Sequence, residues 1–263
     1  MAASETAAAA SESDGLAKPR GGTARALSPA RPRDPADTLS VVIPTLNAQA
    51  RLPGCLGALR AARAAGAVDQ VIVADGGSSD GTPAIAREFG AIVIDAPPGR
   101  GPQLAAGAAA ASGVWLLFLH ADTRLAPGWE RVLAGHLAAP SAAGVAAAFR
   151  LAFDEVSDGA ERVARLANWR ARRLGLPYGD QGLVIARALY DAVGGYRELA
   201  LMEDVDLVRR LGRRRIRLLD AVAVTSAARY RRDGWWARPA RNLCVLALYL
   251  AGLPPRFVRR LYG

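Results

Sequence analysis

The stretch that most constrains the fold runs from Val114 to Arg124 and reads Val-Trp-Leu-Leu-Phe-Leu-His-Ala-Asp-Thr-Arg. Six consecutive apolar residues are typical of a strand buried on both faces, which among alternating strands and helices means a central parallel strand. His120 and Asp122 follow at its carboxyl end. Because open α/β sheets bind ligands beyond those ends, this element predicts contact with a metal or a phosphate.

Strand and helix patterns alternate through the first half of the chain. The expected strands are residues 39–43, 71–74, 91–94 and 114–119, and the expected helices between them are residues 52–64, 83–89 and 104–111. Residues 99–103 are expected to form a turn. This order, with short connections, predicts right-handed crossovers into a mostly parallel sheet flanked by helices, an architecture that binds nucleotides.

The second half continues with fewer strands. We expect helices at residues 128–137, 161–173 and 204–211, and strands at 144–153 and 183–185. The helix at 204–211 carries acids in its first turn, where the helix dipole favours them. Arg213 to Arg215 are expected in a surface turn.

The length fits one large α/β domain better than two. Residues 1–37 lack apolar periodicity and are expected to be disordered, because they cannot bury enough surface to offset the cost of ordering. Residues 38–232 would form the domain, and residues 233–263 a basic and apolar C-terminal segment.

A formal net charge of +10 suggests an anionic partner. Nucleic acid is disfavoured, because the basic residues lack interleaved aromatics and no binding-fold signature occurs.

The two cysteines, Cys55 and Cys244, form no CxxC motif, so a reduced cytoplasmic setting with packed thiols is expected. His136 is expected at the surface.

Polar residues follow successive expected strands: Asn47, Asp75, Arg100 and Asp122. A single Asp after a strand is more often a cap or turn residue than a ligand. Four polar terminations on one sheet edge instead predict a site. The octet from Asp75 to Thr82 adds glycines and small hydroxyls, which allow backbone to approach a nucleotide closely.

These residues also carry a resemblance. The motifs Ile-Pro-Thr-Leu-Asn at 43–47, Ala-Asp-Gly-Gly-Ser-Ser-Asp-Gly-Thr at 74–82, His-Ala-Asp-Thr at 120–123 and Met-Glu-Asp-Val-Asp at 202–206 resemble, in this order, those of family 2 glycosyltransferases with a GT-A fold. The likeness covers roughly residues 39–230. Arg100-x-x-Gln103 and Gly-Asp-Gln-Gly at 179–182 further resemble a compact bacterial subgroup, some of whose members are labelled carotenoid-acid (diaponeurosporenoate) glycosyltransferases.

The resemblance implies transfer from a nucleotide sugar, with uridine as the expected base. Asp75 would accept a hydrogen bond from the base, and the other nucleotide-binding residues would be Pro44, Thr45, Asn47, Arg100 and Gln103.

For the metal, the resemblance implies that Asp122 takes a divalent cation, Mg²⁺ or Mn²⁺. The chain departs from the family pattern where His120 replaces the first acid of an acid-x-acid motif, and where Ala48 stands in place of a frequent Glu. The His substitution makes mixed ligands or weaker metal dependence an alternative. A structural hydrogen bond is an equally good interpretation of His120.

An acceptor hydroxyl needs a carboxylate to take its proton, and the family motif places this base at Glu203-Asp204, with Asp204 preferred. Spacing alone would allow Glu203, Asp204 or Asp206, and the structural alternative is an acidic helix start. A single displacement implies inversion at the anomeric carbon. Residues expected at the sugar or acceptor are Asp180, Gln181 and Arg232. Arg232 would belong to a basic clamp with Arg229 and Arg231, although a run of arginines such as this one is more often a solvated loop.

Residues 243–253 are strongly apolar but stop at Pro254-Pro255, short of the roughly 20 residues that cross a bilayer. Flanking arginines, among them Arg238, Arg241 and Arg256, and Trp235-Trp236 favour a segment at an anionic membrane surface. Burial against the domain is the alternative. The first interpretation fits a lipid acceptor and a protein peripheral to the cytoplasmic face of the plasma membrane.

Two other functions compete with a glycosyltransferase. A nucleotidyltransferase shares the nucleotide-binding half, but usually has a glycine-rich basic signature after its first strand, where this chain has Pro-Thr-Leu-Asn at 44–47. A non-enzymatic basic membrane-binding module would explain the arginines. It leaves the carboxylates at the sheet edge without a role.

Overall fold

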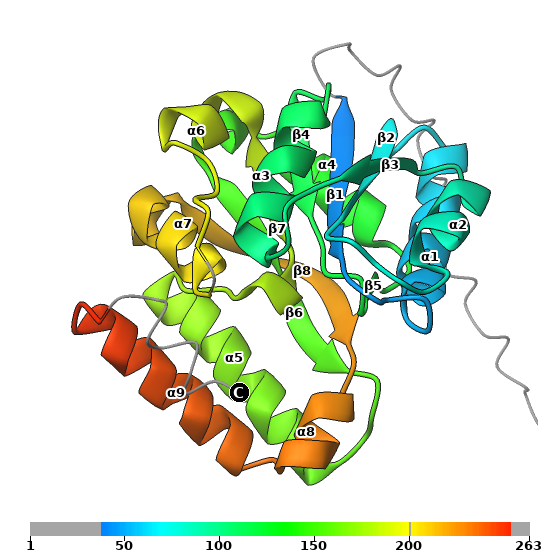
Figure 1. Ribbon diagram of the computed structural model, residues 1–263. Helices are drawn as coiled ribbons and strands as arrows, with labels where there is room; N and C mark the ends of the chain where they lie inside the picture. Colours follow the sequence, from blue (N-terminus) through cyan, green and yellow to red (C-terminus); the bar gives the residue numbers. More distant parts are fainter. Residues whose placement is uncertain (1–37, 200, 254–263) are drawn as a thin grey trace, which may run out of the picture. The chain divides into compact units, whose positions relative to one another are not determined.

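The centre of the structure is a sheet built from strands that lie far apart in sequence (Figure 1). The computed structural model describes residues 38–199 and 201–253, all within one compact unit. In these residues the sheet has eight strands in the order β3-β2-β1-β4-β7-β6-β8-β5. The strands are β1 Leu39–Thr45, β2 Gln70–Asp75, β3 Ile92–Asp95, β4 Trp115–Phe118, β5 Thr123–Leu125, β6 Ala146–Phe153, β7 Leu183–Ala186 and β8 Ile216–Thr225.

The first four strands in spatial order are parallel, as predicted. β7 then runs antiparallel to β4 and to β6, and β8 is parallel to β6. Two strands were not predicted, β8 and the short β5, which pairs antiparallel with β8. The segment that holds His120 and Asp122 therefore leaves the centre of the sheet at β4 and returns to the sheet at β5, on its edge.

The helices are α1 Leu52–Ala64, α2 Thr82–Glu88, α3 Arg100–Ala110, α4 Trp129–Leu137, α5 Asp158–Leu174, α6 Arg187–Ala192, α7 Glu203–Leu211, α8 Ala228–Asp233 and α9 Ala237–Leu250. The prediction of a turn at residues 99–103 is wrong, because α3 already begins at Arg100. Gly99 adopts a φ of 121°, which lets the chain turn in one residue, so Arg100 and Gln103 both belong to the first helical turn.

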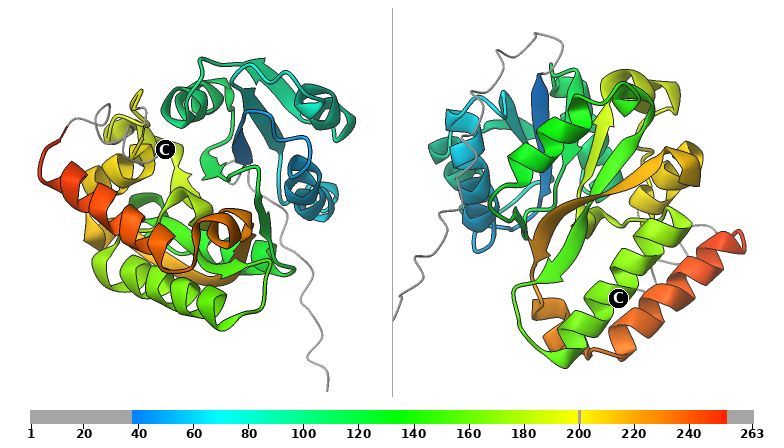
Figure 2. Two further views of the ribbon diagram at one scale, coloured as in Figure 1. Left: turned by 60° about the horizontal axis from the view of Figure 1, so that its bottom comes forward. Right: turned by 180° about the vertical axis from the view of Figure 1, so that it is seen from behind.

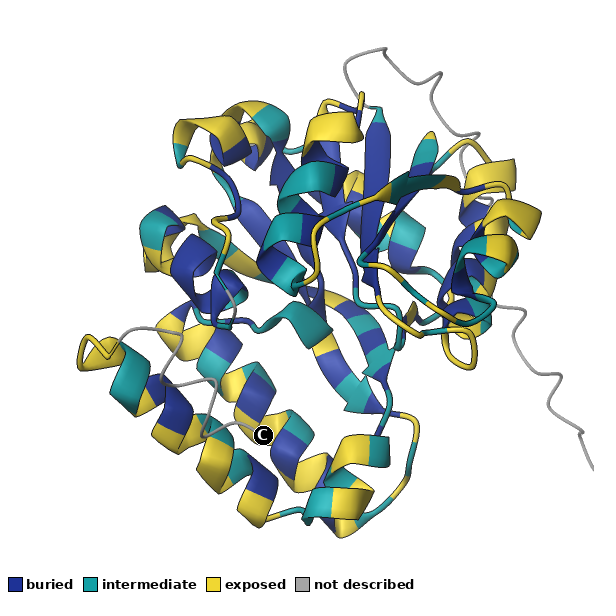
Figure 3. Cartoon of the chain, viewed as in Figure 1, coloured by how far each residue is buried: buried dark blue, intermediate teal, exposed yellow. Residues whose placement is uncertain are grey.

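Burial follows the sheet (Figure 3). All residues of β1 are buried, which explains its mostly apolar sequence, interrupted only by Ser40 and Thr45. α3 packs on β1 where Gly107 lies against Val42, so closely that a Cβ on this glycine would come within 2.3 Å of Val42 Cγ1. α5 is held along β6 by Asn168, whose side chain accepts from the backbone N–H of Leu151 at 2.7 Å and donates to its carbonyl at 3.0 Å.

The C-terminal helix α9 lies beside α5 (Figures 1 and 2). One side of it is buried, since Val245 and Leu246 pack with Met202 and Val205 of the α7 region. In the described part of the chain, no helix is both long and apolar enough to span a membrane. The expectations for residues 1–37 and for Arg256 fall outside the described residues.

Three surface predictions are wrong. His136 is only 4% exposed, because α4 turns it inward against the edge of the Trp115 ring. Cys244 is exposed on α9, whereas Cys55 is packed as predicted. Arg238, expected to flank a membrane segment, is 7% exposed and forms an ion pair with Asp233 at 2.5 Å.

Candidate active site

Asp75 ends β2 and organises the loop that follows it. Its carboxylate accepts from Thr45 Oγ1 at 2.9 Å, from Ser78 Oγ at 2.6 Å, and from the backbone N–H groups of Ser78 and Gly77 at 2.8 and 3.2 Å. Burial opposes ionisation, but these donors outweigh it and lower the pKa of Asp75. Asp75 thus fixes the loop geometry. Contact with a nucleotide base stays a prediction.

The loops after β1 and β2 are braced against each other. Asn47 has a φ of 50° and donates its backbone N–H to Ser78 Oγ at 2.8 Å, while its Oδ1 accepts from the N–H of Ser79 at 2.9 Å. The next residue, Ala48, donates its N–H to Thr82 Oγ1 at 2.8 Å. The small hydroxyls of the octet therefore hold the β1 loop in shape.

Gln103 fastens α3 to the ends of β1 and β2. It is 3% exposed, and its Nε2 donates to the carbonyl oxygens of Thr45 at 2.5 Å and Ala74 at 3.2 Å. A bridge of this kind positions the start of α3, and with it Arg100, over the carboxyl ends of these strands.

Above these strand ends lies a pocket of about 300 Å³, which we call the loop pocket. The predicted residues Pro44, Thr45, Asn47, Arg100, Gln103, His120 and Asp122 all line it. Arg51 and Arg229 line it too. Three arginines and a single carboxylate give this pocket the charge that a diphosphate needs.

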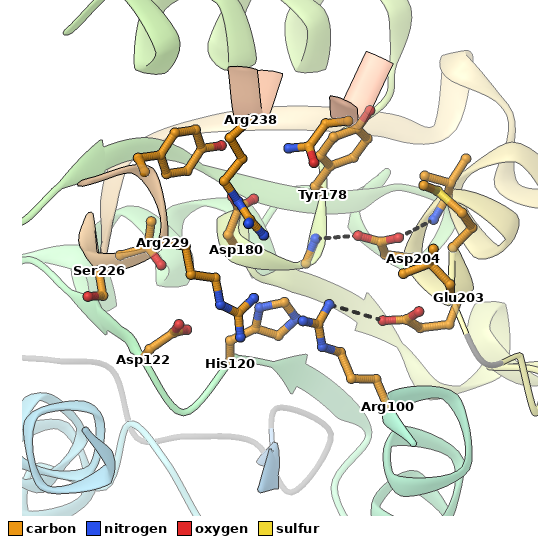
Figure 4. Close-up of a pocket in the computed structure, with 17 residues that line it drawn as sticks. Arg100, His120, Asp122, Tyr178, Asp180, Glu203, Asp204, Ser226, Arg229 and Arg238 are labelled. Atoms are coloured by element: carbon orange, nitrogen blue, oxygen red, sulfur yellow. Dashed lines mark hydrogen bonds and ion pairs between the residues drawn. The ribbon is translucent and has the colours of Figure 1, made fainter. Parts of the chain in front are cut away.

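A second pocket, the α9 pocket, shares Arg100, His120, Asp122 and Arg229 with the first and encloses about 100 Å³. Figure 4 shows its labelled side chains converging from several elements. The remaining lining residues are Tyr178, Gly179, Asp180, Leu201, Met202, Glu203, Asp204, Val205, Thr225, Ser226, Tyr230, Arg238 and Asn242. Asp122, Asp180 and Asp204, distant in sequence, therefore face one cavity.

His120 lies between two guanidinium groups, those of Arg100 and Arg229 (Figure 4). Burial, helped by Arg100 and Arg229, lowers the pKa of His120 to about 4, so the ring is neutral at neutral pH. The ring packs on Gly179, where a Cβ would lie 2.4 Å from His120 Nε2. Only glycine leaves room for the imidazole at this position.

The carboxylate of Asp204 is oriented by two backbone N–H groups, one of them from Gly179. The N–H of Gly179 donates to Asp204 Oδ2 at 2.7 Å, and the N–H of Val205 donates to Oδ1 at 2.7 Å. Glu203 is 2% exposed and lies 3.8 Å from Arg100, and burial together with the charge of Asp204 raises the pKa of Glu203 to about 7.

Asp206, the third acid that spacing allowed as a base, is engaged elsewhere. Arg210 Nε and Nη2 donate to Asp206 Oδ2 at 2.9 and 2.6 Å, and Arg197 lies 3.3 Å from Oδ1. Since both oxygens are paired, Asp206 fastens α7 instead of reaching a substrate.

Two buried acceptor atoms of the α9 pocket lack a partner within the described part of the chain: Asp180 Oδ1 and Asn242 Oδ1. Burial, with the charges of Asp204 and Asp122 adding to it, raises the pKa of Asp180 to about 6. Unpaired buried acceptors are costly, so a bound group with donors would satisfy them. Asn242 was missed because only the packing of α9 brings it here.

The other predicted acceptor residues take different places. Gln181 is fully buried and donates its Nε2 to the Phe149 carbonyl at 3.1 Å, so it anchors the Gly-Asp-Gln-Gly turn to β6. Arg232 lines neither pocket and pairs with Asp233 at 2.7 Å, with a side chain 75% exposed. Arg229 of the same basic run is the one that faces both pockets.

A divalent cation can be tested against these donors. No group of three or more His, Cys, Asp and Glu side chains that could hold a metal occurs within residues 38–199 and 201–253. Where the two pockets meet, the residues that line both of them include one carboxylate, Asp122, and the neutral imidazole of His120. These donors suit a cation that takes its other ligands from a bound diphosphate and water.

The fold and the site define an α/β protein with an acidic and arginine-lined cleft at the carboxyl ends of its parallel strands. The model of Glycosyl transferase family 2 matches residues 40–195, more than half of the chain. The protein therefore belongs to glycosyl transferase family 2, which confirms the resemblance drawn from the motifs. The carotenoid-acid subgroup stays a prediction.

Curated relatives match a shorter part. The PGL/p-HBAD biosynthesis glycosyltransferases of Mycobacterium tuberculosis and Mycobacterium bovis are 40% identical over 97 residues, 34% of this chain and 37% of theirs. The match thus spans little more than a third of the relatives' length.

Solved structures agree on the fold. Glucosyl-3-phosphoglycerate synthase from Mycobacterium tuberculosis, in complex with Mn²⁺, UDP and phosphoglyceric acid, has a TM-score of 0.57 at 23% identity, covering 83% of this chain and 80% of that one. S. aureus TarS has a TM-score of 0.56 at 16% identity, covering 86% and 69%. The expected GT-A fold is confirmed.

Proposed function

We propose that this protein transfers a sugar from a nucleoside-diphosphate sugar, with uridine as the expected base, to a lipid or other small-molecule acceptor, with inversion at the anomeric carbon. The observation that carries the proposal is the meeting of Asp122 and Asp204 in one pocket, next to an arginine-lined one. The binding of Mn²⁺ and UDP by the structurally similar synthase supports it.

The loop pocket is the proposed donor site. Arg51, Arg100 and Arg229 line it and would attract a diphosphate and screen its charge as the sugar leaves. Asp122, with the neutral His120 beside it, would hold a divalent cation, which as a Lewis acid stabilises charge on the departing diphosphate. The two arginines that flank His120 supply part of the same stabilisation, which fits a weaker dependence on metal.

Asp204 is the proposed general base. It lines the α9 pocket, and the two backbone donors fix its carboxylate in one orientation. An acceptor hydroxyl would pass its proton to Asp204 as its oxygen attacks the anomeric carbon and the diphosphate departs. Base catalysis of this kind contributes about 10²–10⁴ in rate. Glu203 lies beside Arg100 and stabilises the position of that guanidinium.

The α9 pocket is the proposed site for the sugar and the acceptor. Asp180 Oδ1 and Asn242 Oδ1 would accept from hydroxyl groups, while Tyr178, Leu201 and Met202 offer apolar surface to a lipid portion such as that of a carotenoid acid. A carboxylic-acid acceptor is already ionised near neutral pH. It would need no base, and Asp204 would orient it.

A lipid acceptor would bring the protein to the cytoplasmic face of the plasma membrane as a peripheral protein. The donor would reach the loop pocket from solution. The proposal involves neither a membrane-spanning helix nor a nucleic-acid partner.

The experiment compares Asp204→Asn with Glu203→Gln. We expect Asp204→Asn to lower kcat by about 10²–10⁴-fold with a hydroxyl acceptor, whereas UDP with Mn²⁺ still raises its melting temperature, because a ligand of the native state stabilises it. Glu203→Gln serves as the control that removes a neighbouring carboxylate. Loss of UDP binding in Asp204→Asn, or a larger kcat loss in Glu203→Gln, would contradict the assignment.

A further inference from the structure

α9, together with Trp236 just before it, carries a stripe of exposed apolar side chains. Trp236, Leu243 and Leu250 are 71%, 66% and 48% exposed. Their spacing of seven residues places them on one side of the helix. Val245 and Leu246 of the same helix are instead buried against the domain. The exposed stripe is therefore not needed to hold α9 in place.

α5 adds three more exposed apolar side chains. Leu166, Trp169 and Leu174 are 57%, 54% and 47% exposed, although the helix is otherwise rich in arginine. The guanidinium of Arg162, one turn before Leu166, lies 4.3 Å from the ring centroid of Trp236. This contact links α5 to the stripe of α9, and the two helices lie side by side in Figures 1 and 2.

Arginines gather at the C-terminal end of α5. A Cβ on Gly175, the αL residue that ends the helix, would lie 2.8 Å from the Cα of Arg213, so this helix end packs directly on the turn Arg213–Arg215. Arg172, Arg173 and all three arginines of the turn are exposed, and none has an acidic partner within the described residues. The predicted surface position of this turn is confirmed.

We infer that the α5–α9 face, defined by Leu166, Trp169, Leu174, Trp236, Leu243 and Leu250 with the arginines 172, 173 and 213–215, docks on a bilayer of anionic phospholipid. Apolar and indole side chains enter the boundary between headgroups and acyl chains, and the arginines pair with the headgroup charge. The unpaired arginines beside the stripe favour this occupant over a second copy of the chain, whose like charges would repel.

The docked face adjoins the active site. α9 presents Leu243 outward and the preceding residue, Asn242, into the α9 pocket. A bound bilayer would thus lie against the wall of the pocket that is proposed to receive the acceptor. The inference rests on the proposed function only for this last point, because binding to vesicles needs no turnover.

Co-sedimentation with vesicles tests the surface directly. The full chain is mixed with vesicles of phosphatidylcholine alone or of phosphatidylcholine with phosphatidylglycerol. We expect pelleting with the anionic vesicles, weakened by salt, and little with the neutral ones. Truncation before α9 is not a suitable test, because it would expose the packed side chains of Val245 and Leu246.

Charge is tested at the arginine turn. The triple variant R213Q/R214Q/R215Q should bind anionic vesicles on the order of 100-fold more weakly, at about five-fold per arginine. The matched control R87Q/R124Q/R131Q removes the same charge from exposed arginines outside the face and should bind nearly as the wild type does.

The apolar stripe is tested with L243Q/L250Q, which we expect to weaken binding at least 10-fold. Its control is I92Q/V114Q, at side chains 47% and 43% exposed outside the face. Equal pelleting of a face variant and its control would overturn the inference. The inference would also be overturned if light scattering showed a dimer of the wild type that L243Q/L250Q disrupts, and if the wild type did not bind vesicles.

Stabilisation by UDP with Mn²⁺ is measured in every variant. If vesicle binding is absent while UDP still stabilises the protein, only the docking surface fails. If vesicles bind but UDP has no effect in the wild type, the proposed function fails and the docking surface stands.

Discussion

Asp180 offers a test of the site through stability. Burial raises the pKa of Asp180 from 3.8 to about 6, so the native state still holds a proton where the unfolded chain has lost it. Stability therefore falls as the pH rises from about 4 to about 6, and the loss is complete above that range. At 1.36 kcal/mol per pKa unit, the ionised carboxylate costs the native state roughly 3 kcal/mol.

Asp180→Asn removes this cost without changing the shape of the side chain. We expect the variant to be more stable than the wild type by up to about 3 kcal/mol near pH 7.5 and by only about 1 kcal/mol near pH 4.5. Urea unfolding at both pH values measures the difference. The same substitution should lower transfer, because a neutral amide oxygen is a weaker acceptor for a substrate hydroxyl than a carboxylate.

Asp220→Asn is the matched control. Asp220 pairs with Arg150 on the surface at 2.9 Å with a side chain 87% exposed, so its replacement should change stability by less than about 1 kcal/mol at either pH. If Asp180→Asn gains no more stability near pH 7.5 than near pH 4.5, the carboxylate is not held in a desolvated pocket and the reasoning is refuted.

Two further substitutions probe how the site is held. Gly179→Ala would push a Cβ against the His120 ring and disturb the N–H that orients Asp204, so we expect kcat to fall at least about 10-fold and the protein to be destabilised by about 1–3 kcal/mol. A variant with wild-type kcat and melting temperature would show that the His120 ring moves freely. Arg210→Met leaves buried Asp206 without its closest partner and should lower the free energy of unfolding in urea by about 3–5 kcal/mol. Adding Asp206→Asn to this variant should recover part of the loss. No recovery would mean that Arg210 stabilises the fold through its hydrogen bonds to backbone carbonyls instead.

The apolar pattern of the chain is enough to predict the parallel half of the sheet and the order of the polar residues at its edge. An apolar run such as residues 114–119 is buried on both faces when it forms a central strand of a parallel sheet, and the carboxyl ends of parallel strands meet at one edge of the sheet. Asn47, Arg100 and Asp122 were placed correctly on that ground. The helix start at Arg100 was missed, because the freedom of Gly99 is a backbone property that no hydrophobic pattern records.

Contacts between distant segments settle which polar side chains hold the fold together and which face the cavity. Gln181 and Asp206 looked like site residues, yet burial among backbone and arginine partners makes them anchors. Asn242 carried no local signal and enters the pocket because α9 packs back onto α7. Hydrogen-bond partners and desolvation depend on contacts between segments distant in the chain, so no reading of neighbouring residues could supply them.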